Sequence, residues 1–284
     1  MKIAGVQCNV RFKEVSANVT AIQETLRETS QQGTQLTVFP ECSVTGYCFN
    51  SKEEAFEVAQ RIPGPATERI AETCNETNQH AIVGMVERDG EELYNAAVLI
   101  GPDGVVASYR KVHLPFLGLD RFASPGNRAF DVAVADETKV AMLICYDASF
   151  PEAARCVSLL GADLITLPTN WPPGSECAAA SAIACRALEN GVYFIAVNRV
   201  GEERGFRFIG RSQICDPSGR IMHMASESEE EIFYAEIDLE RARRKHIIRV
   251  PGQHEIHRFA DRRPEMYGAL TKPHGLAKPG RSNN

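Results

Sequence analysis

The stretch KVAMLICYDASFPE, residues 139–152, predicts in succession a buried strand, a cysteine at its end and the start of a helix. Residues 140–144 are a continuous apolar run of strand length, and Cys145 follows directly. Pro151 and Glu152 are typical of a first helical turn, because proline loses no useful N–H there and an acid suits the positive helix end. We therefore expect a thiol at the rim of a sheet, beside free backbone N–H groups. A buried structural cysteine is the alternative, since free cysteines are among the most buried residues.

The length and composition of the chain allow a single large unit with an ample core. The chain has 284 residues, 44% of them hydrophobic, and α/β folds often reach this size in a single unit. The net charge of −6 and the lack of a basic run argue against nucleic acid as the main partner. Because no apolar segment approaches about 20 residues, we expect no membrane span. The N-terminal sequence MKIAGVQCNV predicts a first strand, not a signal peptide.

The nine cysteines are odd in number and scattered, without the CxxC spacing of a zinc site. This pattern indicates reduced thiols in a cytoplasmic protein, not a disulfide framework. The seven histidines form no metal-binding pattern, and we expect His254 and His257 at the surface of a polar tail. The sequence therefore predicts no metal site.

The first forty residues predict a right-handed β-α-β unit. Strands are expected at residues 3–8 and 36–39, and a helix at residues 17–31 that Ser16 could cap. Glu41 lies just past the second strand, and the carboxyl end of a strand is the usual place for chemistry in such sheets. Taken alone, Glu41 would be better explained as a solvated loop carboxylate.

Two turn signals, at residues 89–90 and 102–104, predict an antiparallel meander in the next segment. Its strands are expected at residues 81–87, 93–100 and 105–109. Lys111 lies at the end of the third of these strands. An ordinary exposed lysine is the alternative at this position.

The second half of the chain has the same plan, combining strand–helix units with hairpins. Further strands are expected at residues 128–134, 140–144, 164–167, 193–198, 209–215, 220–224 and 231–237, and further helices at 51–61, 67–78, 151–160, 176–190 and 239–246. This plan predicts two sheets packed back to back, with helices outside. We divide the chain into one domain, residues 1–250, and a tail, residues 251–284, that is either disordered or packed on a partner subunit.

Glu41, Lys111 and Cys145 each lie where a core strand gives way to a loop, which is the arrangement that a thiol hydrolase needs. A thiol attacks well only as a thiolate, so a base or a cation must be near it. Glu41 could take the thiol proton and later give it to a leaving amine. Lys111 could hold the negative oxygen that develops on the attacked carbon, and the N–H of Tyr146 could be a second donor.

Six stretches of the chain together resemble the nitrilase superfamily of carbon–nitrogen hydrolases. They occur in family order and cover nearly everything from residue 1 to about 240. The stretches are LTVFPECSVTGY around Glu41, YNAAVLIGPDGVVASYRKVHLP around Lys111, LICYDASFPE around Cys145, GADLITLPTNWP, CRALENGVYFIAVNRVG and FIGRSQICDPSGRI.

The resemblance implies an α/β fold of the four-layer αββα sandwich type and a catalytic triad of Glu41, Lys111 and Cys145 that needs no cofactor. It implies a thioester acyl-enzyme that water hydrolyses. It also implies a homodimer or higher homo-oligomer, with the C-terminal tail at the interface.

Two positions depart from the family pattern. Many members have a second glutamate in the loop after the lysine, and the nearest carboxylate here is Asp120, one methylene shorter. We expect Asp120 to orient Lys111 or the substrate amide, with a surface loop acid as the alternative. Members often have an arginine before the Phe-Pro-Glu that follows the cysteine, whereas this chain has Ser149.

The residues near the nucleophile favour an amide substrate. Enzymes of this family that attack nitriles tend to have Cys-Trp-Glu, whereas Cys145-Tyr146-Asp147 resembles the amidase and carbamoylase branches. The substrate-binding candidates are Tyr47, Tyr146, Asn170 and Trp171, the last with a core position as its alternative. Three arginines of a late loop, Arg199, Arg204 and Arg207, could reach the site, although such residues are more often solvated.

The sequence thus predicts hydrolysis of a small linear amide to a carboxylic acid and ammonia. The alternative within the family is an N-carbamoyl amine hydrolase, which also releases carbon dioxide. A nitrilase ranks below that alternative. Two further alternatives are a Cys–His hydrolase that uses His113 and a binding protein without enzymatic activity. A nucleotide-binding fold is excluded, because no glycine fingerprint follows the first strand.

Overall fold

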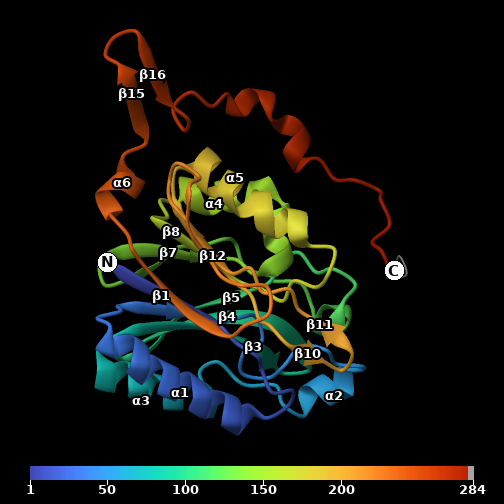
Figure 1. The fold of residues 1–284 in the computed structure, drawn as a ribbon. Helices are drawn as coiled ribbons and strands as arrows, with labels where there is room; N and C mark the ends of the chain where they lie inside the picture. Colours follow the sequence, from blue (N-terminus) through green and yellow to red (C-terminus); the bar gives the residue numbers. More distant parts are fainter. Residues whose placement is uncertain (281–284) are drawn as a thin grey trace.

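The computed structural model describes residues 1–280, which form four layers in the order helices, sheet, sheet, helices (Figure 1). Two helices, α1 (Val15–Gln31) and α3 (Pro65–Thr77), cover the first sheet. Two others, α4 (Pro151–Leu159) and α5 (Ile183–Asn190), cover the second. This is the αββα sandwich that the sequence predicts.

The first sheet has six strands in the order β14-β1-β2-β3-β4-β5. Strands β1, β2 and β3 are parallel, and β3, β4 and β5 form the predicted antiparallel meander. The strand bounds are Lys2–Gln7 (β1), Leu36–Val38 (β2), His80–Asp89 (β3), Glu92–Gly101 (β4), Gly104–Arg110 (β5) and Glu231–Glu236 (β14).

The second sheet also has six strands, in the order β13-β12-β9-β8-β7-β6, of which β7, β8 and β9 are parallel. The strand bounds are Ala133–Ala135 (β6), Thr138–Met142 (β7), Leu164–Pro168 (β8), Tyr193–Val197 (β9), Gln213–Cys215 (β12) and Ile221–Met224 (β13). The remaining short elements are α2 (Lys52–Phe56), β10 (Glu202–Glu203), β11 (Phe206–Arg207) and α6 (Leu239–Arg243).

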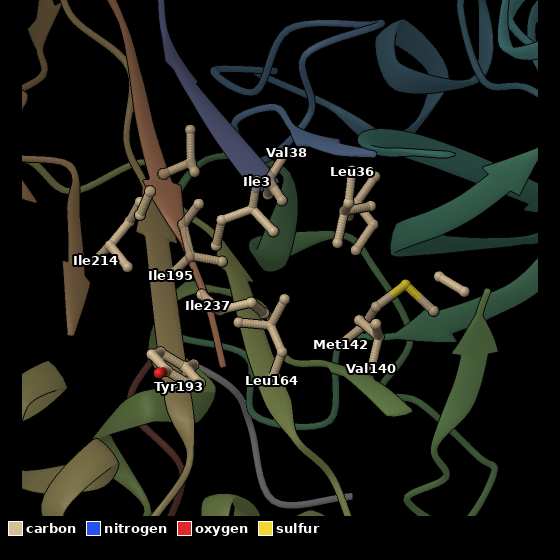
Figure 2. Packing of buried hydrophobic residues seen from close by; sticks show 14 of the residues in the cluster. Ile3, Leu36, Val38, Val140, Met142, Leu164, Tyr193, Ile195, Ile214 and Ile237 are labelled. Atoms are coloured by element: carbon tan, nitrogen blue, oxygen red, sulfur yellow. The ribbon is translucent and has the colours of Figure 1, made fainter. Parts of the chain in front are cut away.

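The central core lies between the two sheets (Figure 2). Ile3 and Val38 of the first sheet belong to one cluster with Leu164 and Ile195 of the second, all of them buried. Because side chains alternate across a strand, the next residue faces the helices: Ile165 packs in the cluster beneath α4 and α5. Strands with both faces covered explain the continuous apolar runs in the sequence.

Several of the predicted elements differ from the structure, among them the helix expected at 51–61, which is limited to Lys52–Phe56, and the strand expected at 209–215, which is limited to Gln213–Cys215. The first helix starts at Val15 and Ser16 does not cap it; instead the amide of Asn18 bonds the backbone N–H and C=O of Arg11 and fixes the helix entrance. The strand expected at residues 128–134 is limited to Ala133–Ala135. The helix expected at 239–246 ends at Arg243, after which the chain turns into a hairpin.

That hairpin consists of β15 (His246–Val250) and β16 (His254–His257) and projects from the sandwich (Figure 1). The hairpin spans residue 250, where the sequence predicts a domain boundary. That boundary stays a prediction. The chain then runs past the layer of α4 and α5, where the ring of Phe259 lies beneath the cations of Arg155 and Lys245. Residues 281–284 of the predicted tail lie outside the described residues. Within residues 1–280, no helix is both long and apolar enough to cross a membrane.

Candidate active site

The carboxyl ends of strands from both sheets meet at one place. Glu41 follows β2 and Lys111 follows β5 in the first sheet, whereas Cys145 follows β7 in the second. The charges of Glu41 and Lys111 both act on the pKa of the Cys145 thiol, which means that the three groups lie close together. The structure therefore brings together the three side chains that the sequence singles out.

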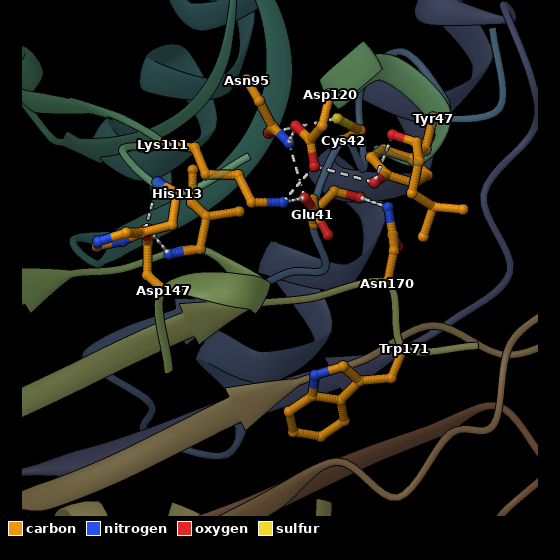
Figure 3. Close-up of polar contacts among 12 residues, drawn as sticks. Glu41, Cys42, Tyr47, Asn95, Lys111, His113, Asp120, Asp147, Asn170 and Trp171 are labelled. Carbon is orange, nitrogen blue, oxygen red and sulfur yellow. Dashed lines mark hydrogen bonds and ion pairs between the residues drawn. The ribbon is translucent and has the colours of Figure 1, made fainter. Parts of the chain in front are cut away.

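Lys111 is fully buried between two carboxylates (Figure 3). Its Nζ lies 2.7 Å from Oε1 of Glu41 and 2.5 Å from Oδ2 of Asp120. Burial lowers the pKa of the ammonium, but Asp120 and Glu41 outweigh this and hold the pKa well above its ordinary value. Lys111 is thus a permanent cation at neutral pH.

Asn95 and Tyr47 make further hydrogen bonds to the two carboxylates. The amide nitrogen of Asn95 lies 2.7 Å from Oε1 of Glu41 and 2.8 Å from Oδ1 of Asp120. The hydroxyl of Tyr47 donates to Oδ2 of Asp120 at 3.0 Å. These contacts join Asp120 to Lys111 and to the walls of the site, and Asp120 is fully buried, not a surface loop acid.

Glu41 retains one carboxylate oxygen for further chemistry. Among the described residues, Oε2 of Glu41 is buried without a hydrogen-bond partner. Burial raises the pKa of the carboxyl and Asp120 raises it further, while Lys111 and Asn95 act in the opposite direction. A carboxylate with a raised pKa is a stronger base, which suits proton transfer near neutral pH.

The backbone at Cys145 is held in an uncommon conformation. Cys145 begins a 3₁₀ turn (η2, Cys145–Ser149) with φ of +45°, a left-handed value that non-glycine residues rarely adopt. Such a conformation costs about 1–3 kcal/mol and persists only where the surroundings impose it. It marks the residue as a candidate functional position.

The carboxylate of Asp147 stabilises that turn through hydrogen bonds. Its Oδ2 accepts the N–H of Ile144 at 3.0 Å and the hydroxyl of Tyr109 at 2.8 Å. Its Oδ1 accepts the N–H of His113 at 3.0 Å and lies 2.7 Å from Nδ1 of the same histidine. The carboxylate is fully buried, so it joins the Cys145 turn firmly to the strand end that carries Lys111.

The surroundings of the Cys145 thiol favour its protonated form. Burial of the sulfur and the negative charge of Glu41 raise its pKa to about 12. Lys111, the hydroxyl of Thr169 and the backbone N–H of Asn170 act in the opposite direction. The residue as a whole is nevertheless partly exposed. A base must remove the proton before the sulfur attacks.

The four predicted substrate-binding residues fall in different places. The side-chain amide of Asn170 donates to the backbone oxygen of Glu41 at 3.0 Å, and its Oδ1 is buried without a partner among the described residues. Tyr47 is directed to Asp120. The ring of Tyr146 is 40% exposed and lies edge-on to Phe150. The indole of Trp171 packs in the cluster beneath the second sheet, apart from the polar groups (Figure 3).

The arginines of the late loop do not form a clamp for a carboxylate. Arg199 is fully buried and pairs with Glu203 at 2.5 Å, and Arg204 pairs with Glu54 at 2.7 Å. Arg207 is exposed in the short strand β11. The first two arginines are therefore already neutralised within the protein.

Sequence reasoning missed Asn95, Asp147 and Thr169 as parts of the site. The sequence could have indicated Asn95, because it is a polar residue within an otherwise apolar strand, and such a residue needs a buried hydrogen-bond partner. No cluster of three or more His, Cys, Asp or Glu side chains suited to a metal occurs within residues 1–280.

Known proteins resemble this chain in sequence and in fold. A family model described as carbon-nitrogen hydrolase matches residues 2–246. A protein named nitrilase from Pyrococcus abyssi is 43% identical over 94% of this chain and 99% of its own length. An omega-amidase from Xenopus tropicalis is 32% identical over 90% of this chain and 93% of its own length. The crystal structure of an amidase from Nesterenkonia sp. has the same fold, with a TM-score of 0.78 at 24% identity, over 95% of this chain and 96% of that one.

Proposed function

This chain belongs to the carbon–nitrogen hydrolase family, and we propose that it hydrolyses a small linear amide to a carboxylic acid and ammonia. One observation carries the proposal: a buried ammonium lies between two carboxylates beside a thiol that needs a base. Such a cluster supplies a nucleophile, a base and an electrostatic stabiliser at one point, which acyl transfer requires.

In the first half-reaction, Glu41 takes the proton of the Cys145 thiol while the sulfur attacks the amide carbon. The carbonyl oxygen becomes negative, and the ammonium of Lys111 stabilises it together with the N–H of Tyr146. Glu41 then gives the proton to the amide nitrogen, the C–N bond breaks, ammonia leaves and a thioester remains on Cys145.

In the second half-reaction, Glu41 takes a proton from a water molecule that attacks the thioester carbon. The C–S bond breaks, the carboxylic acid leaves and the proton returns to the sulfur. Amide and water are thus converted to acid and ammonia without any cofactor. Asp120 holds Lys111 in place throughout, because its Oδ2 lies 2.5 Å from the ammonium.

A neutral acyl group fits the site better than one bearing a carboxylate. The cations of Arg199 and Arg204 are neutralised by Glu203 and Glu54, and Lys111 already has two carboxylate partners. Burial of a further negative charge beside Glu41 and Asp120 would cost free energy. We therefore expect uncharged aliphatic amides to be better substrates than amides of dicarboxylic acids.

Nitrile hydrolysis is a second candidate, because the Pyrococcus abyssi relative is named a nitrilase. N-carbamoyl amines are a third candidate, since attack on a ureido carbon needs the same nucleophile and base. Amides and nitriles both give a carboxylic acid and ammonia, whereas an N-carbamoyl amine gives an amine, ammonia and carbon dioxide.

A substrate panel separates the candidates. Purified protein is assayed for ammonia and carbon dioxide with small amides, N-carbamoyl amines and nitriles, and Cys145→Ala is the blank. The proposal predicts ammonia without carbon dioxide from the amides, and no ammonia above the blank from the variant. Turnover of nitriles alone, or equal activity of Cys145→Ala, would refute it.

We further propose that the protein is a cytoplasmic homodimer or higher homo-oligomer. All nine cysteines are free, which suits a reducing compartment. Large apolar side chains on the outer helices, Leu159, Leu160 and Leu188, are 40–52% exposed and would suit burial against a second copy. Light scattering during size-exclusion chromatography tests the assembly, and a monomer at micromolar concentration would contradict it.

A further inference from the structure

The candidate active site is divided between two sheets, so its geometry depends on how the sheets are joined at that edge. Glu41 and Lys111 are attached to the first sheet, and Cys145 to the second. A displacement of about 1 Å between reacting groups can cost about a hundredfold in rate. Contacts that cross between the sheets near the site therefore bear directly on catalysis.

Arg199 makes such contacts from the end of β9 in the second sheet. It is the largest fully buried side chain among the described residues. Its guanidinium donates to the backbone oxygen of Val10 at 2.7 Å and to the side chain of Asn9 at 3.1 Å, both just past β1 of the first sheet. It also pairs with Glu203 at 2.5 Å and lies over the ring of Phe208.

Glu203 continues the connection to the loop after β2. Its Oε1 accepts the backbone N–H of Tyr47 at 2.8 Å and that of Cys48 at 2.6 Å, while Oε2 binds Arg199. Gly46 suits this crowded position: its φ is +83°, and a Cβ there would lie 2.7 Å from the ring of Phe12 and 3.3 Å from Oε2 of Glu203. The carboxylate thus fixes the backbone at Tyr47.

Tyr47 connects that backbone to the catalytic ammonium. Its hydroxyl donates to Oδ2 of Asp120 at 3.0 Å, and its backbone oxygen accepts the N–H of Leu119 at 2.8 Å. The same Oδ2 of Asp120 holds Nζ of Lys111 at 2.5 Å. A continuous chain of polar contacts therefore runs from Arg199 in the second sheet to Lys111 in the first.

We propose that Arg199 and Glu203 are positioning residues for catalysis, which hold the Tyr47 loop so that Asp120 and Lys111 face the thiol of the other sheet. This inference rests on the proposed function only for its kinetic readout. A buried ion pair is weak support for stability, because desolvation offsets much of its attraction, and well-packed apolar residues often serve as well. The directional bonds to the Tyr47 loop give this pair a purpose that apolar residues could not provide.

The test compares Glu203→Gln with a matched control, Asp163→Asn. Asp163 is also a buried carboxylate that binds one arginine, Arg243, and one backbone N–H, but it lies at the opposite end of β8 from Asn170. We expect Glu203→Gln to lower kcat about tenfold or more with KM within about twofold. Asp163→Asn should lower the thermal midpoint without changing kcat.

Alkylation by iodoacetamide gives a readout that needs no substrate. Site-resolved mass spectrometry follows Cys145, with the exposed thiols of Cys156, Cys177 and Cys185 as references in the same sample. Displacement of Lys111 and its partner Glu41 should slow the alkylation of Cys145 in Glu203→Gln but leave the references unchanged. If wild-type protein hydrolyses no amide, the proposed function fails, and this rate still tests the positioning role.

Tyr47→Phe covers the case in which Glu203→Gln does not fold, because it removes only the hydroxyl bonded to Asp120. It should reproduce the loss of kcat and the slower alkylation of Cys145. Wild-type values of both in a folded Glu203→Gln, or in Tyr47→Phe, would overturn the inference. An equal loss in Asp163→Asn would also overturn it, since the effect would then be one of general stability.

Discussion

The Nζ of Lys111 and the Oε1 of Glu41 lie 2.7 Å apart, and neither side chain is exposed to solvent. The two residues are 70 positions apart in the chain and follow strands separated by two others in the same sheet. A buried pair of this kind has a large desolvation cost, which the second carboxylate, Asp120, and the amide of Asn95 help to offset. Its position beside Cys145 is the reason to expect catalysis.

Replacement of Lys111 by Met should abolish most of the activity and destabilise the fold. The oxyanion loses its cation, which is worth about 10²–10³ in kcat. Two buried carboxylates also lose their partner, which costs about 3–5 kcal/mol in the free energy of unfolding. Steady-state kinetics and urea unfolding measure the two effects, and a variant with wild-type kcat would exclude Lys111 from the chemistry.

The activity should fall with decreasing pH at a higher value than an ordinary glutamate would give. Glu41 acts as a base only when deprotonated, and burial and Asp120 raise the pKa of its carboxyl. The acid limb of kcat/KM should therefore lie above about pH 4.3, the usual pKa of glutamate. A limb at or below that value would contradict the assignment of Glu41 as the base, provided that circular dichroism shows the protein folded there.

His113→Ala should retain activity, in contrast to Asp147→Asn. The ring of His113 is held by Asp147 at 2.7 Å and stacks on Phe150, so it orients no proton in the proposed reaction. Asp147 instead fixes the Cys145 turn through four hydrogen-bond contacts, two at each carboxylate oxygen. An asparagine side chain has only one accepting oxygen, so it could not keep all four. We expect a loss within about tenfold for His113→Ala and a larger one for Asp147→Asn. Complete inactivity of a folded His113→Ala would favour the Cys–His alternative.

Much of the fold follows from local patterns in the sequence. The apolar runs around Ile3, Leu36 and Leu164 are strands because both faces are covered, and Pro151 begins a helix as its fixed φ favours. The hairpin of β15 and β16 was missed because its strands are short and polar, and only Pro251-Gly252 marks the turn.

The site was predictable where it depends on strand ends and less so where it depends on partners. Glu41 and Lys111 could be placed because the carboxyl ends of strands face one edge. The neutralisation of Arg199 could not be predicted, because Glu203 lies in the same irregular loop and only the folded chain shows that the two side chains meet. Trp171 likewise had two possible environments, and its apolar neighbours put the indole in the core.

Asp120→Asn decides between the two roles that the sequence left open for Asp120. If Asp120 orients Lys111, the variant loses the stronger partner of the ammonium while Glu41 retains its own contact at 2.7 Å. The transition state then suffers more than substrate binding, so kcat should fall about tenfold to a hundredfold with KM nearly unchanged. If Asp120 instead binds the substrate amide, KM should rise while kcat changes little.

Asn95→Leu is the companion variant, because it removes the amide that bridges Asp120 and Glu41 and leaves both carboxylates on Lys111. A kcat loss in Asp120→Asn that exceeds the loss in Asn95→Leu would show that the carboxylate acts through the ammonium, because only Asp120→Asn weakens that ion pair directly.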